Sequence, residues 1–134
     1  MVVDLAKKYA KIFSVLGSEE RLSVLVVLHG SHYIRHQHPE TKGDGCLSFS
    51  QILEATEIDS DTRLSYHLSK LLDAKLVSKS ALMDEKGRVF PVYTTTEIWQ
   101  QFASDLGLDK EIKEYISKKY PTLFFQKKDE SSIT

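Results

Sequence analysis

The sequence predicts a mainly α-helical protein with one small β-hairpin, and two patterns indicate this fold class. In several segments apolar residues recur every three or four positions, which is the spacing of one face of an amphipathic helix. Two short runs, residues 79–83 and 89–93, flank a polar segment with Gly87 as two strands flank a hairpin tip. With 134 residues, of which 41% are hydrophobic, the chain suits one domain over residues 1–125. The polar residues 126–134 are expected to form a flexible tail.

The first two helices are predicted over residues 5–16 and from Glu19 to about residue 28. In the first helix one apolar stripe contains Leu5, Tyr9, Ile12, Phe13 and Leu16. Ser18 can cap the second helix because its hydroxyl can accept a hydrogen bond from a backbone amide of the first turn. The His-Gly pair at residues 29–30 is expected to close this helix, since glycine commonly follows a helix end.

A histidine-rich stretch follows, and residues 31–46 are predicted to form an inserted loop because they lack a helical period and contain Pro39. Imidazole and thiolate groups bind zinc and other transition metals, and the candidate ligands here are His29, His32, His36, His38 and Cys46. Their spacing matches no closed structural metal site. Three interpretations stay open: a specific metal site, a loop that binds nucleic acid or responds to pH, and an inert insertion. No other cofactor is expected.

Two further helices joined by a tight turn are predicted after this stretch. Ser48 or Ser50 can cap a short helix that runs to about residue 55, and a turn follows at residues 57–59. Asp59 or Ser60 can then cap a longer helix of about residues 60–74. Its apolar positions lie on one face, and they are Leu64, Leu68, Leu71 and Leu72.

The hairpin and two more helices complete the predicted order. Gly87 supplies the permissive backbone that the tip between strands 79–83 and 89–93 needs. A threonine at position 94, 95 or 96 can cap a helix that Gly107 ends. A last helix is predicted from Leu108 to about Tyr120.

This order of elements is the winged helix-turn-helix arrangement. Four segments point to one family in particular: residues 16–25, the run from Leu64 to Val77, and the hairpin sequences 87–90 and 93–96. They resemble the corresponding parts of ArsR-type transcription regulators. The resemblance implies DNA binding and a homodimer formed through the N- and C-terminal helices. Lys75 departs from the family pattern, which usually has glycine there, and the turn at residues 58–61 is one residue longer than the commonest version.

We expect the helix of about residues 60–74 to enter the major groove of double-stranded DNA, with the wing of about residues 79–93 on the backbone. Arg63 could make a bidentate contact to guanine, and other polar groups could bind bases or phosphates. The predicted DNA-binding residues are Thr62, Arg63, Ser65, Tyr66, Ser69 and Lys70 on the helix and Lys86 and Arg88 in the wing. His67 lies beside the apolar face, where it could pack, form a hydrogen bond at the domain edge, or contact DNA.

Composition and motifs argue against several other classes of protein. The 18 basic and 19 acidic residues give a formal net charge of −1, so any DNA-binding surface must arise from local clustering. The chain lacks a glycine-rich phosphate loop and a nucleophile motif, and we expect no enzyme. The single cysteine, together with the lack of a long apolar run or signal-like start, favours a cytoplasmic protein without membrane contact. The alternative function is a winged-helix protein-interaction module of a transcription or replication complex.

Overall fold

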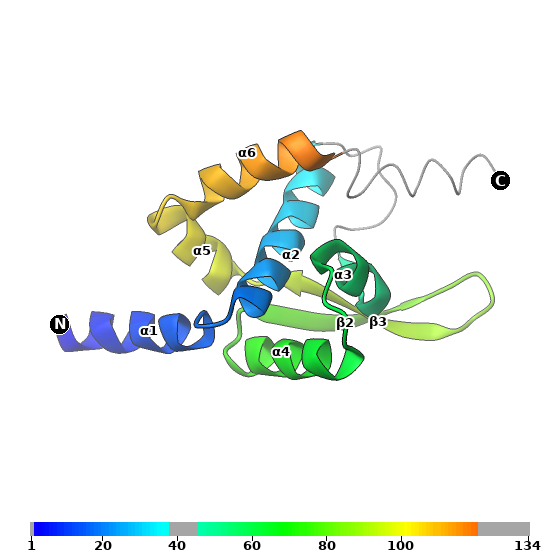
Figure 1. Cartoon of the computed structure of the whole chain (residues 1–134), viewed down its shortest axis with the longest axis horizontal. Helices are drawn as coiled ribbons and strands as arrows, with labels where there is room; N and C mark the ends of the chain where they lie inside the picture. Colours follow the sequence, from blue (N-terminus) through cyan, green and yellow to red (C-terminus); the bar gives the residue numbers. More distant parts are fainter. Residues whose placement is uncertain (1, 38–45, 121–134) are drawn as a thin grey trace.

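The computed structural model describes residues 2–37 and 46–120, and it confirms a mostly helical protein with a small antiparallel sheet (Figure 1). The expected tail of residues 126–134 lies outside the described residues. The elements in chain order are α1 (Val2–Val15), α2 (Glu19–Gln37), β1 (Leu47–Ser48), α3 (Phe49–Thr56), α4 (Asp61–Asp73), β2 (Val77–Met83), β3 (Val89–Thr95), α5 (Glu97–Asp105) and α6 (Leu108–Tyr120).

The sheet has three antiparallel strands in the order β1-β3-β2. β2 and β3 form the predicted hairpin, in which residues pair from Val77 with Thr95 to Met83 with Val89. The hairpin extends two residues further toward the core at each strand than the sequence predicts. Gly87, with φ of +81°, lies at its tip as expected. β1 was not predicted, because a strand of two residues is too short to show an alternating pattern.

The core is centred on α2, which packs against α3, α4, α6 and β3. In Figure 1 α2 runs between the α5–α6 pair and the part of the fold that contains α3, α4 and the sheet. Leu25 and Leu28 of α2 are fully buried. From α4 the core receives Leu64, Leu68 and Leu71, which confirms the predicted apolar face of this helix. Burial of these side chains fixes α4 on α2.

The predicted end of the second helix is wrong, because α2 continues through the His-Gly pair to Gln37. The expected loop therefore does not include residues 31–37, and residues 38–45 lie outside the described residues. Gly30 has a packing role instead: a Cβ at this position would lie 2.5 Å from Cγ1 of Ile116 in α6. The sequence shows a glycine here but not the neighbouring helix that requires it.

We expect Gly30→Ala to lower the free energy of unfolding by about 1–3 kcal/mol, the usual effect of overpacking a dense core. Ile116 is fully buried and β-branched, so it has little room to move away from the added methyl group. Urea unfolding would measure the change. Gly17→Ala is the matched control, because its Cβ would meet only a backbone oxygen of Ser14 at 3.6 Å. Equal stabilities of the two variants would contradict this account.

A row of three hydrogen-bonded side chains joins α2 to α5 and α6, and it is buried at Trp99 and His29 and partly exposed at Asp109. The indole N–H of Trp99 donates to Nδ1 of His29 at 3.0 Å, and Nε2 of His29 lies 2.7 Å from Oδ1 of Asp109. Because Nδ1 accepts a hydrogen bond, it carries no proton, and Nε2 carries the proton that bonds to Asp109. Burial raises the pKa of Asp109, but hydrogen bonds from Lys113 and His29 outweigh burial and hold that pKa below its ordinary value. This row fixes the imidazole tautomer at the centre of the helical core.

We expect His29→Leu to destabilise the protein by about 1–3 kcal/mol, because it leaves the buried indole N–H of Trp99 without an acceptor. Trp99→Phe removes that donor, so the double variant should be more stable than the sum of the two single changes predicts. Thermal unfolding followed by circular dichroism would give all three values. Strictly additive losses would show that the bond between the two rings contributes nothing.

Candidate functional site

The start of α4 is set by local hydrogen bonds after a tight turn. α3 ends at Thr56, its C-cap Glu57 turns the chain with a φ of 59°, and the buried side chain of Ile58 anchors the turn to the core. Ser60 is the N-cap of α4, and its hydroxyl accepts a hydrogen bond from the backbone N–H of Arg63. This confirms one of the two caps that the sequence left open.

One side of α4 carries a continuous exposed stripe of polar residues. Its members follow the helical spacing i, i+3, i+4, i+7 and i+8, and they are Thr62, Ser65, Tyr66, Ser69 and Lys70. Tyr66 is 54% exposed, and Nζ of Lys70 lies 5.3 Å from the centre of its ring. None of these five residues is acidic, whereas Asp61 and Asp73 lie at the two ends of the helix. We call these five residues the α4 stripe.

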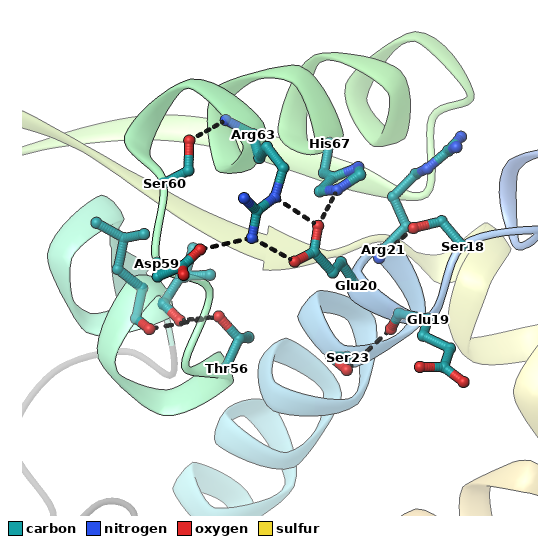
Figure 2. A network of polar contacts seen from close by, with 12 residues as sticks. Ser18, Glu19, Glu20, Arg21, Ser23, Thr56, Asp59, Ser60, Arg63 and His67 are labelled. Atoms are coloured by element: carbon teal, nitrogen blue, oxygen red, sulfur yellow. Dashed lines mark hydrogen bonds and ion pairs between the residues drawn. The ribbon is translucent and has the colours of Figure 1, made fainter.

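Arg63 is exposed together with these residues, as predicted, but its guanidinium is directed toward α2 (Figure 2). Its Nε and Nη2 donate to the two carboxylate oxygens of Glu20 at 3.1 and 2.9 Å. Nη2 also donates to Oδ1 of Asp59 at 2.7 Å. The reason is electrostatic: Arg63 lies at the edge of the exposed side of α4, and two nearby carboxylates attract its guanidinium, with Glu20 drawing it toward α2.

His67 lies one turn after Arg63 on the same flank, and its Nε2 is 2.9 Å from Oε1 of Glu20. Its side chain is 9% exposed, so the structure favours the hydrogen bond at the domain edge over a DNA contact. Hydrogen bonds from Arg63, and then from His67, lower the pKa of Glu20 to about 2. In turn, hydrogen bonds to the carboxylates of Glu20 and, second, of Asp59 raise the pKa of Arg63. We call Glu20, Asp59, Arg63 and His67 the Glu20 network.

Residues 9–85, more than half of the chain, match a family described as Domain of unknown function (DUF7347). The chain belongs to this family. No curated protein matches it. Within residues 2–37 and 46–120, no helix has both the length and the apolar character needed to cross a membrane. The DUF7347 domain includes α2, α3, α4 and β2, and it therefore contains both the α4 stripe and the whole Glu20 network.

The junction between α4 and β2, also inside the DUF7347 domain, passes through Lys75. Its φ of 62° is in the left-handed region that favours glycine, although the residue here is lysine. The carbonyl of Lys75 accepts a hydrogen bond of 2.6 Å from the hydroxyl of Thr96, which is also the N-cap of α5. This bond ties the end of α4 to the start of α5.

At the hairpin tip, the two basic residues that the sequence singled out have different surroundings. Arg88 donates from Nε to Oδ2 of Asp84 at 2.8 Å. Asp84 also accepts from the backbone N–H groups of Lys86 and Arg88, and these bonds, led by the one from the Arg88 backbone, lower its pKa despite partial burial. Asp84 therefore shapes the turn and offsets the charge of Arg88, while Lys86 stays exposed.

The histidine-rich segment does not form a metal site among the residues whose side chains the structure describes. Over that part of the chain, no group of three or more His, Cys, Asp or Glu residues could hold a metal ion. Both ring nitrogens of His29 are engaged by Trp99 and Asp109, so this candidate ligand has a structural role. His32 and Cys46 each interact with other groups of the protein, and His38 lies outside the described residues. His36 belongs to α2 and not to a loop.

Sequence reasoning missed Glu20 as part of the site, because it precedes Arg63 by 43 positions and no local pattern links the two. The only sequence signal was the i, i+4 spacing of Asp59 and Arg63, which is common to paired charges on helices. The approach of the first turn of α2 to α4 is a consequence of core packing. The network is therefore visible only in three dimensions.

The Glu20 network should stabilise the fold in a pH-dependent way. The pKa of Glu20 falls from an ordinary value of 4.5 to about 2 on folding, so its contribution is fully present above about pH 4.5 and disappears toward pH 2. We expect Glu20→Gln to lower the urea midpoint above pH 4.5 and to match the unchanged protein near pH 2. A difference between the two proteins that does not vary over this pH range would contradict the assignment.

Proposed function

We propose that this protein binds double-stranded DNA as a winged-helix transcription regulator similar to the ArsR-type proteins, with α4 as its recognition helix. The single observation that carries this proposal is the α4 stripe. An exposed row of hydroxyl, phenol and ammonium groups on a helix whose opposite face is anchored in a core is the arrangement that major-groove recognition requires.

The chemistry of the α4 stripe suits both kinds of DNA contact. Lys70 and the hydroxyl groups of Thr62, Ser65 and Ser69 can bind phosphate oxygens or base edges. Tyr66 adds a planar, half-exposed ring with a hydrogen-bonding tip. Arg63 leaves the set of base-reading residues in this proposal, because its guanidinium is bound by Glu20 and Asp59.

The hairpin would act as the wing, with Lys86 as its phosphate contact and Arg88 partly neutralised by Asp84. In Figure 1 the hairpin tip extends beyond the helices, which leaves it accessible to a bound duplex. The order of α3, α4 and the three-stranded sheet supports this assignment of elements.

A homodimer through the N- and C-terminal helices forms part of the proposal. Phe13 of α1 is 55% exposed although its ring contacts Phe102 of α5, and Ile98 and Leu106 of α5 are 46% and 51% exposed. Apolar groups left in water on these helices favour a second copy as their partner. A two-fold dimer would present two copies of α4 to half-sites about one helical turn apart, roughly 34–36 Å.

We expect the protein to bind a random-sequence duplex at low salt, with Lys70→Ala weakening binding and reducing the slope of log affinity against log salt by about 0.9. Fluorescence anisotropy over a range of salt concentrations would measure both quantities. Lys118→Ala on α6 is the matched control, since it removes the same charge from an exposed position away from the α4 stripe. Equal effects of the two variants would contradict a DNA contact by α4.

The second candidate function, a winged-helix protein-interaction module, is favoured by the outer part of the hairpin. Met83 and Val89 form a cross-strand pair and are 69% and 65% exposed, and the neighbouring Leu82 is 39% exposed. Such apolar groups suit a protein partner better than a phosphate backbone. Absence of duplex binding at the lowest salt concentration would favour this second function.

A further inference from the structure

The Glu20 network places the arginine of α4 beside the proposed DNA-binding surface but directs it away from that surface. Arg63 is the residue next to Thr62, the first member of the α4 stripe, and its side chain is 51% exposed. Its charge is offset by the carboxylate of Glu20 from α2 and by that of Asp59 from the preceding turn. The α4 stripe is thereby left with the ammonium of Lys70 and with uncharged groups.

We infer that Glu20 is an internal competitor for DNA phosphate: its carboxylate holds Arg63 against α2 and so limits the affinity of α4 for DNA. This inference rests on the proposed function and concerns the regulation of that same site. The bidentate contact of Arg63 with Glu20 has the geometry with which a guanidinium also binds two phosphate oxygens, so the two anions compete for one group.

The exchange leaves no buried charge without compensation. Glu20 is 35% exposed and keeps its hydrogen bond to His67 when Arg63 leaves, and Asp59, at 83% exposure, becomes hydrated. Both exposed ion pairs with Arg63 are of the kind that salt screens and water weakens. A duplex with a phosphate near the start of α4 can therefore replace Glu20 as the partner of the Arg63 guanidinium. A duplex bound without a phosphate at that place cannot.

The test uses Glu20→Gln in the full chain, because glutamine keeps an oxygen that can accept from His67 while it removes the charge that holds Arg63. We expect this variant to bind a random-sequence duplex more tightly, with a salt slope steeper by about 0.9, the value for one added phosphate contact. With that slope, its advantage over the unchanged protein grows about threefold when salt falls from 200 to 50 mM.

Two matched variants separate a released Arg63 from a simple change in net charge. Glu19→Gln removes one negative charge from the adjacent exposed position of the same helix turn and should leave the slope unaltered. Glu20→Gln combined with Arg63→Ala restores the original net charge and should return the affinity and the slope to those of the unchanged protein. Circular dichroism would show that each variant is folded.

The outcomes distinguish this inference from the proposed function. If the unchanged protein binds the duplex and Lys70→Ala weakens that binding, but Glu20→Gln behaves as Glu19→Gln does, the inference is overturned and the proposed function stands. If neither the unchanged protein nor folded Glu20→Gln binds the duplex at 50 mM salt, the inference and the proposed function are both overturned. Binding that appears only in Glu20→Gln and disappears with Arg63→Ala supports both.

Discussion

The packing of α2 is the constraint on which the rest of the structure depends, because this helix contacts both halves of the fold. At Gly30 its backbone approaches Ile116 of α6 so closely that a methyl group does not fit without movement. At His29 it accepts a hydrogen bond from Trp99 and reaches Asp109. Its first turn holds α4 through Glu20. A shift of α2 would therefore move it relative to α4 on one side and to α5 and α6 on the other.

This constraint divides α4 into three sides with different chemistry. The apolar side is buried against the core, and the flank with Arg63 and His67 meets the first turn of α2. The third side is the α4 stripe, which faces solvent. Glu20 and Asp59 offset the charge of Arg63. The polar groups of the α4 stripe are therefore four hydroxyl groups and the ammonium of Lys70. In the proposed function, contact with DNA would therefore depend on shape and hydrogen bonding as well as on charge.

The hairpin differs between its base and its outer part for a related reason. Tyr93 and Thr95 at the base are buried, whereas the outer residues have no helix packed over them among the described residues and remain exposed. The base is held by the bond between Thr96 and the carbonyl of Lys75, a lysine in the left-handed conformation. The direction of the hairpin relative to α4 is thus set at this junction.

Local patterns in the sequence were enough to predict the helices, the hairpin and several of their ends. The caps at Ser60 and Thr96, the tip at Gly87 and the buried face of α4 depend on contacts within a few residues, and such contacts leave a periodic or positional signal. The exposed positions of the α4 stripe follow from the same period. The recognition role of that stripe remains a proposal.

Only the tertiary structure decided the parts that depend on neighbours distant in sequence. The sequence suggests that Gly30 ends a helix, but α2 continues past it to Gln37, and the missing side chain leaves room for Ile116. His29 suggests a metal ligand until Trp99 and Asp109 engage both of its nitrogens. Arg63 suggests an exposed cation without a partner, but Glu20 binds its guanidinium. In each case the residue type allows several partners, and the packing of α2 selects the one that is present.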